Sequence, residues 1–113
     1  MKTDLTYLRS LTSDSDNLIK EMIDIFISQV QEYKDEMKRD LQEQDWESLG
    51  KIAHKAKSSV AIMGMKELAD DLKTLELLAR DKKETESYPE YVRKFNESCD
   101  EAVKELQSIN PKN

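Results

Sequence analysis

Apolar residues recur every three or four positions along most of this chain, which is the spacing of one face of an α-helix. The longest such stretch predicts a helix over about residues 15–43. Its inward positions are Ile19, Met22, Ile23, Phe26, Val30, Tyr33, Met37 and Leu41. The next stretch predicts a helix from Trp46 to about Met63, with Asp45 as its N-terminal cap. Gly64 should end it, because glycine tolerates the left-handed conformation.

Two more amphipathic stretches follow. One predicts a helix over about residues 66–84, and its inward positions are Leu68, Leu72, Leu75 and either Leu78 or Ala79. The other predicts a last helix with Pro89 in its first turn, which ends at Asn110-Pro111. Its inward positions are Tyr91 or Val92, Phe95, Cys99, Val103 and Leu106. Residues 80–87 are polar and charged, so the first of these two helices is expected to fray into a loop there.

A short leading helix is predicted by Leu5, Leu8 and Leu11, which follow the possible cap Asp4 at helical spacing. Together the stretches predict an all-α fold, an antiparallel up-down-up-down four-helix bundle with a short additional N-terminal helix. The chain shows no internal repeat and no evident linker. We therefore expect residues 1–113 to form a single domain.

Composition supports this class and narrows the function. The chain has 113 residues with only two glycines and two prolines, which leaves little material for a turn-rich β fold. Its net charge of −6 argues against a general nucleic-acid binder and against docking on anionic membranes. The single cysteine, Cys99, cannot form an internal disulfide, and no apolar run approaches the roughly 20 residues of a membrane span. Residues 1–10 lack a secretory signal. We therefore expect a cytoplasmic protein that is by default a monomer.

His54 is the only histidine of the chain, and it lies in the helix predicted over residues 46–63. At about 100° per residue, the inward positions of this helix lie within roughly 60° of the direction opposite the histidine. These positions are Leu49, Ile52, Ala56, Val60 and Met63. The histidine is therefore predicted to point out of the bundle. This argues against a buried core histidine and leaves an ordinary solvated surface residue as the alternative.

Small residues surround His54 along its own helix. Gly50 and Ser58 lie one turn before and after it, and Ala61 lies two turns after, so no long side chain of this row shields the imidazole. A glycine inside a helix costs about 1 kcal/mol relative to alanine. An open approach to the ring would explain Gly50, and so would close packing against a neighbouring helix.

Polar residues near His54 suit a phosphoryl group. Lys51 and Lys57, three positions before and after it, could neutralise such a group on the imidazole, or they could belong to an ordinary solvated face. Ser58 lies on the histidine face and could donate a hydrogen bond to a phosphoryl oxygen. Ser59 leans toward the core and could instead bond back to a carbonyl.

The segment of residues 53–64 resembles the active helix of histidine-containing phosphotransfer (Hpt) domains. His54 falls on the phosphorylated histidine of that family and Lys57 on its lysine. Ser59 falls on the family serine and Gly64 on the closing glycine.

The resemblance extends on both sides of this segment. The pairs that fit the family are Asp45-Trp46, Leu68-Ala69 and Leu75-Glu76, and the similarity covers nearly the whole chain. Two positions depart from the family pattern. Ser58 stands in place of a glycine and Ala56 in place of a leucine, and neither change removes a group that the chemistry needs.

The resemblance implies an intermediate of a phosphorelay. His54 would accept a phosphoryl group from the aspartate of one receiver domain and pass it to the aspartate of another. The partners would be the receiver domains of response regulators or of a hybrid sensor histidine kinase. Since such relays place Mg²⁺ in the receiver, the resemblance implies no cofactor, metal or ATP-binding activity in this chain. Candidate docking residues, which could instead widen the core face, are Leu18, Ile25, Ile27, Ala61, Ile62 and Gly64.

The main alternative is a non-catalytic helical adaptor, either unrelated to this family or a member whose histidine is no longer used. A metal-binding bundle is disfavoured, because its ligands would include repeated Glu-x-x-His pairs and the chain has one histidine. The pairing of His54 with Lys57 argues against a decayed member.

Overall fold

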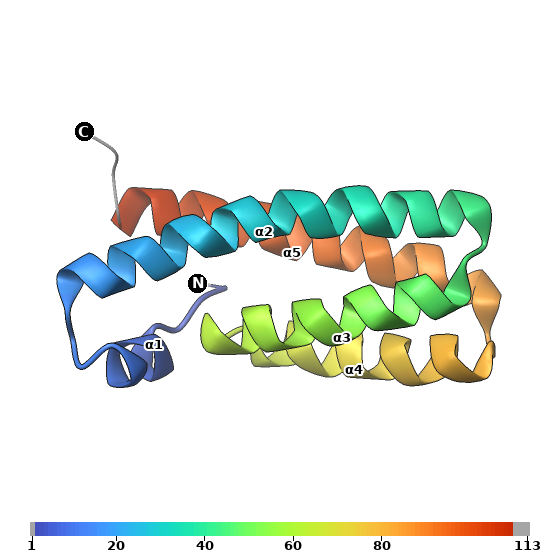
Figure 1. Cartoon of the computed structure of the whole chain (residues 1–113), viewed down its shortest axis with the longest axis horizontal. Coiled ribbons are helices and arrows are strands. Elements are labelled where there is room, and N and C mark those ends of the chain that lie inside the picture. The colour runs from blue at the N-terminus through green and yellow to red at the C-terminus, as the bar shows by residue number, and fades with distance from the viewer. Residues whose placement is uncertain (1, 110–113) are drawn as a thin grey trace.

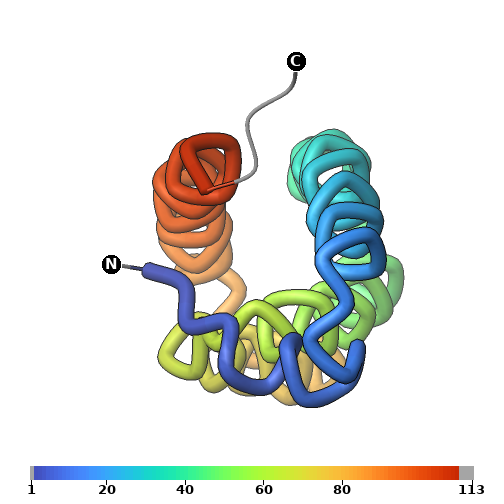
Figure 2. Tube along the Cα trace, turned by 90° about the vertical axis from the view of Figure 1, so that its left-hand side faces the viewer, coloured from blue at the N-terminus to red at the C-terminus, as the bar shows by residue number. Residues whose placement is uncertain are grey.

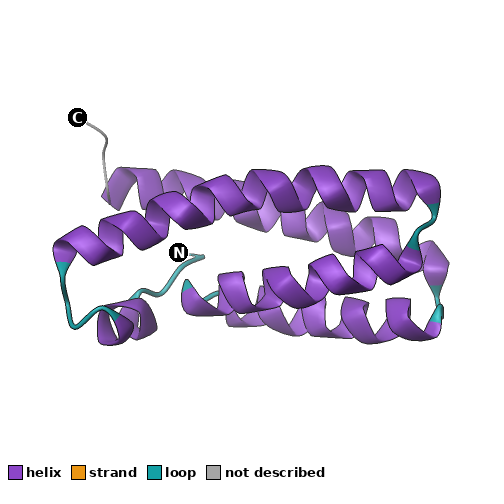
Figure 3. Ribbon diagram, viewed as in Figure 1, coloured by secondary structure: helices purple, strands orange, loops and turns teal. Residues whose placement is uncertain are grey.

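The computed structural model describes residues 2–109, and Figure 3 shows that this part of the chain consists of helices and loops without a strand. The elements are α1 (Thr6–Leu11), α2 (Asp16–Glu43), α3 (Trp46–Ile62), α4 (Lys66–Asp81), a 3₁₀ turn η1 (Thr85–Ser87) and α5 (Tyr88–Ile109). Figure 1 shows α2 and α5 along one side of the molecule and α3 and α4 along the other. The long helices alternate in direction, which confirms the predicted antiparallel bundle with a short leading helix.

Local sequence signals begin and end these helices. The side chains of Ser15 and Asp45 each accept a hydrogen bond from the backbone N–H three residues on, at 3.4 and 3.1 Å. Gly64 has a φ of +77° after α3, so the predicted roles of Asp45 and Gly64 are confirmed. Lys82 also takes the left-handed conformation, and it ends α4 three residues earlier than predicted. The end predicted at Asn110-Pro111 lies outside the described residues.

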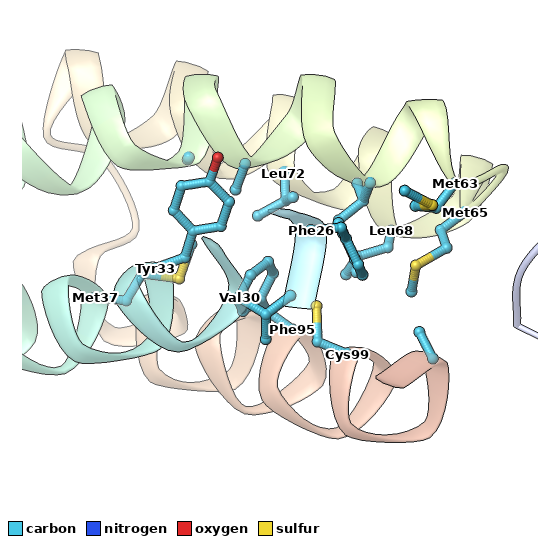
Figure 4. Close-up of a cluster of buried hydrophobic side chains, with 14 of the residues drawn as sticks. Phe26, Val30, Tyr33, Met37, Met63, Met65, Leu68, Leu72, Phe95 and Cys99 are labelled. Atoms are coloured by element: carbon cyan, nitrogen blue, oxygen red, sulfur yellow. The ribbon is translucent and has the colours of Figure 1, made fainter. Parts of the chain in front are cut away.

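The core lies between the four long helices. Figure 4 shows Phe26, Val30 and Tyr33 of α2 facing Leu72 of α4 and Phe95 of α5. The rings of Tyr33 and Phe95 meet edge to face, with centroids 6.4 Å apart. Among residues 2–109, no helix combines the length and the apolar character needed to cross a membrane.

Some predicted inward positions lie at the edge of this core. Those that are only partly buried are Met22, Leu41 and Val103. Where the pattern left two choices, the buried residues are Ala79 and Val92, and the partly buried ones are Leu78 and Tyr91. The edge positions follow from the rotation of each helix against its neighbours, which periodicity alone does not specify.

Asp40 is a buried acidic residue that the apolar pattern did not predict. Its side chain is 1% exposed, and both carboxylate oxygens lack a hydrogen-bond partner among the described residues. Burial raises the pKa of this carboxyl above its ordinary value, and Ser48 together with Arg39, whose Nε lies 3.9 Å away, offsets the effect only in part. In the sequence, an acidic residue at an inward position is indistinguishable from an exposed polar residue, so the burial of Asp40 could not be predicted.

The N-terminal segment closes one end of the bundle, and Figure 2, which looks along the long helices, shows α1 lying across that end. Leu8 of α1 is fully buried there. The N-cap of α1 is Leu5, so the predicted cap Asp4 lies one residue too early. Asp4 nevertheless accepts hydrogen bonds through its Oδ1 from the N–H and the hydroxyl of Thr6. Its own N–H donates to the carbonyl of Met63 at 2.9 Å, and the preceding residues bond to Glu105 of α5. The segment thereby ties the end of α3 to the end of α5.

Candidate functional site

His54 lies in the middle of α3 and points away from the core. Its side chain is 62% exposed, whereas the inward positions of α3, among them Leu49, Ala56 and Val60, are buried. The structure therefore gives the ring the outward direction that the helical wheel predicts. An outward ring is accessible, but accessibility alone does not separate a reactive histidine from an ordinary surface histidine.

Glu76 of α4 is the residue that makes this histidine unusual. Its Oε2 lies 2.9 Å from Nδ1 of His54, and its Oε1 accepts a hydrogen bond from Nζ of Lys57 at 3.1 Å. One carboxylate thus bridges the histidine and the lysine of α3. Glu76 had no assigned role in the sequence analysis. The sequence feature that could have pointed to Glu76 is its position next to the inward residue Leu75 on α4. A side chain at the border of the inward face lies close to a neighbouring helix.

The charge of Glu76 decides which nitrogen of His54 carries a proton. Burial tends to raise the pKa of this carboxyl, but the hydrogen bonds from Lys57 and from His54 outweigh burial and lower it. An ionised carboxylate can only accept hydrogen bonds, so Nδ1 of the neutral imidazole is the donor. Nε2 is then left with a free lone pair, which is what a nucleophilic histidine requires.

Lys51 and Lys57, which were predicted to flank His54 and neutralise a phosphoryl group, have other partners in the structure. Lys57 is only 28% exposed and bonds to Glu76 on the α4 side of the ring. Lys51 is exposed but lies 3.7 Å from Glu47 of its own helix. Each lysine therefore already faces a carboxylate, and the picture of two free cations flanking His54 does not hold for the structure.

The two serines, Ser58 and Ser59, differ in exposure and in hydrogen-bond partners. Ser58 is exposed on the histidine face of α3. The sequence predicted that Ser59 could bond back to a carbonyl, but the structure gives its hydroxyl other partners. Its hydroxyl lies 2.8 Å from the hydroxyl of Tyr33 and donates to Oε1 of Gln29 at 3.2 Å. Ser59 therefore links α3 to α2, and Ser58 is the serine available at the surface.

Gly50 is buried where α3 crosses α4. A Cβ at this position would lie 3.6 Å from Cβ of Ala79 and 3.6 Å from the carbonyl oxygen of Glu76. These are ordinary contact distances, so packing against α4 does not by itself require a glycine here. The absence of a side chain leaves the approach to His54 along its own helix open, which favours the other interpretation of Gly50.

An open hollow of about 740 Å³ lies beside His54 between α3 and α4. We call it the α3–α4 hollow. Its lining residues are Glu47, Gly50, Lys51, His54, Lys55, Glu76, Ala79, Arg80 and Lys82. The floor is made by small residues, and most of the charged groups on its rim are cations. Among residues 2–109, no three His, Cys, Asp or Glu side chains are grouped so as to hold a metal ion.

The predicted docking residues do not all lie at the surface. Ile25 is 53% exposed, and Leu18 and Ala61 are also exposed. The partly buried ones are Ile27, Ile62 and Gly64. The carbonyl of Asp4 packs directly against the α carbon of Gly64, because the N-terminal segment crosses it. The sequence analysis missed two exposed apolar residues of the leading helix, Tyr7 and Leu11.

Comparison with known proteins assigns this chain to a family. A sequence model of the Hpt domain matches residues 21–109, which include the histidine of α3 and the bridging carboxylate of α4. No curated protein and no solved structure matched the chain. Since the match covers most of the chain and the structure is the helical bundle typical of Hpt domains, the chain belongs to the Hpt domain family, which indicates a histidine phosphotransfer role in a phosphorelay.

Proposed function

We propose that this chain carries a phosphoryl group on Nε2 of His54, taken from the aspartate of one receiver domain and passed to the aspartate of another. The observation that carries the proposal is the contact of 2.9 Å between Nδ1 of His54 and Glu76. It orients an exposed ring and leaves Nε2 free. We propose that the relay acts in the cytoplasm, where its receiver partners would be.

The chemistry asks little of the bundle beyond orientation and charge. The lone pair of Nε2 attacks phosphorus of the aspartyl phosphate, the P–O bond breaks, and the receiver carboxylate leaves with the electron pair. The proton on Nδ1 stays in place, so the ring becomes positively charged as the new P–N bond forms. Glu76 faces that charge directly and stabilises it. The reverse sequence delivers the phosphoryl group to the second receiver, and we propose that Mg²⁺ is supplied by the receivers.

Docking of a receiver would use the surface on the α2 side of His54. The bond between Ser59 and Gln29 sets α3 and α2 side by side. Ile62 lies one turn beyond Ser59 and Ile25 one turn before Gln29, and because the two helices are antiparallel these isoleucines fall close together. Exposed apolar residues that extend this surface are Leu18 and Ala61. Apolar side chains left at the surface next to a reactive group are typical of a partner interface.

Transfer from a phosphorylated receiver domain tests the proposal directly. Wild-type chain should acquire label that is labile in acid and stable in base, and His54→Gln should acquire none while keeping its helical content, because the ring is exposed. Label on the His54→Gln variant would refute the assignment of the site. Binding of receivers without any transfer would favour the non-catalytic adaptor.

The docking surface has its own test. Ile25→Glu should raise the receiver concentration needed for half-maximal transfer about tenfold, the size expected of one interface contact. Ile109→Glu is the matched control, because it removes another exposed isoleucine at the far end of α5. Equal effects of the two substitutions would argue against this docking surface.

A further inference from the structure

We infer that Arg80, and not Lys57, is the cation of this chain that holds the phosphoryl group on His54. The inference rests on the proposed function and adds to it a residue outside the motif of α3. Three observations support it: the pairing of Lys51 and Lys57 with carboxylates, the position of Arg80 in the α3–α4 hollow, and the packing at Gly50.

Lys57 is engaged by the carboxylate that orients the histidine. Its Nζ lies 3.1 Å from Oε1 of Glu76, and both side chains are largely shielded, at 28% and 21% exposed. If Lys57 moved to a phosphoryl group on His54, it would leave Glu76 without its strongest partner and beside a second negative group. Like charges at close range are unfavourable, so the arrangement favours a lysine that stays on Glu76.

Arg80 occupies the same hollow as His54 and is free of such a partner. No carboxylate among residues 2–109 lies within salt-bridge distance of its guanidinium, whereas Lys51 in the same hollow pairs with Glu47. Arg80 lies one turn after Glu76 on α4, on the same face of that helix. Among the cations of α4, Arg80 is the one that lines the hollow shared by His54 and Glu76.

The directions of the side chains bring Arg80 and His54 together. Side chains of an α-helix lean toward its N-terminus. His54 therefore leans over Gly50, whose ideal Cβ position lies 3.9 Å from the backbone nitrogen of Arg80. Because α4 runs antiparallel to α3, Arg80 leans back toward Glu76 and so toward the ring. The missing side chain at Gly50 leaves room for the guanidinium across the surface of α3.

A guanidinium in this place suits a phosphoryl group better than an ammonium would. Its planar fork donates two parallel hydrogen bonds to a pair of phosphoryl oxygens and keeps its charge at any physiological pH. The alternative role of Arg80 is to stabilise the C-terminal end of α4, where it is the basic residue of the last turn. Arg80→Lys would keep that helix interaction and lose the fork, so the two roles are distinguishable.

Chemical phosphorylation of the full chain with potassium phosphoramidate tests the inference without any receiver. Nε2 of His54 attacks phosphorus, the P–N bond of the reagent breaks, and its nitrogen leaves as ammonia with the electron pair and protons from solvent. We expect Arg80→Ala to lower the rate constant about tenfold, the factor that corresponds to ~1.4 kcal/mol. The ³¹P resonance of the phosphohistidine should also titrate at higher pH in this variant, because a neighbouring cation favours the more charged phosphoryl form. Arg80→Lys should fall between the variant and the wild type.

Lys55→Ala is the matched control, and Lys57→Ala is the variant that compares the two candidate cations. Lys55→Ala removes one charge from the same hollow. We expect its phosphorylation rate constant to change less than twofold and the titration of its ³¹P resonance to shift only slightly. Equal effects of Arg80→Ala and Lys55→Ala, or a larger ³¹P shift in Lys57→Ala than in Arg80→Ala, would overturn the role of Arg80 while leaving His54 as the acceptor. Absence of any label on wild-type His54 would overturn both this inference and the proposed function.

Discussion

Replacing Glu76 by glutamine is the sharpest perturbation of the site, because it removes one charge and almost no volume. In the wild type this carboxylate lies 2.9 Å from Nδ1 of His54 and 3.1 Å from Nζ of Lys57. A hydrogen bond to a charged group contributes about 1.5–3 kcal/mol. The ring of His54 is 62% exposed, so solvent reduces the contribution to about 1 kcal/mol. That is about a fivefold preference for the tautomer with the proton on Nδ1.

Nitrogen-15 NMR of the imidazole measures this preference directly, and the single histidine makes the spectrum unambiguous. Wild-type chain should show an Nε2 that is mainly unprotonated, and Glu76→Gln should show a more even mixture of the two tautomers. Transfer from a phosphorylated receiver should slow about fivefold, because the positive charge that develops on the ring loses its partner. Glu67→Gln, an exposed carboxylate on the same helix, is the control and should change neither result. A wild-type ring protonated on Nε2, or identical spectra for the two chains, would refute the role of Glu76.

The same substitution has a defined dependence on pH. The pKa of Glu76 is lower in the folded chain than its ordinary value of 4.5. The carboxylate therefore stabilises the fold fully above that value, and the contribution is lost as pH falls through the lowered pKa. Denaturant titrations should show wild type about 1 kcal/mol more stable than Glu76→Gln at neutral pH, with the difference disappearing in acid. A difference that grows in acid would contradict this assignment.

Four further substitutions and reactivities follow from the packing. Gly64→Ala should destabilise the chain by at least about 1–2 kcal/mol in thermal melts, because φ is +77° and a Cβ would lie 2.2 Å from the carbonyl oxygen of Asp4. Gly50→Ala, whose Cβ would find ordinary contacts at 3.6 Å, should instead stabilise it by up to about 1 kcal/mol, and a loss of stability would show that α3 and α4 pack more tightly than described. Stability should fall as pH rises from the ordinary carboxyl value of 3.8 through the raised pKa of Asp40, and Asp40→Asn should remove that loss in denaturant titrations at several pH values. Burial raises the pKa of the Cys99 thiol to about 12, so a thiol reagent should react with it only at the rate of unfolding, and fast reaction of the native chain would refute its burial.

Much of the fold followed from local patterns in the sequence. The spacing of apolar residues predicted the four long helices and the leading helix, because each helix buries one face and the period of that face is a property of the backbone. Asp45 and Gly64 marked helix ends through a hydrogen bond and a backbone conformation that involve only nearby residues. The outward direction of His54 followed for the same reason, since it depends only on the angle between positions of one helix.

Contacts between helices were decided by the tertiary structure alone. Glu76 and Arg80 reach the hollow beside His54 because Gly50 packs against Ala79 and thereby sets the rotation and the register of α4 against α3. No periodicity within one helix specifies that register, because it depends on how two surfaces interlock. The sequence thus determined that a histidine would face solvent on a helical bundle, and the packing of α4 decided which carboxylate accepts the hydrogen bond from its Nδ1.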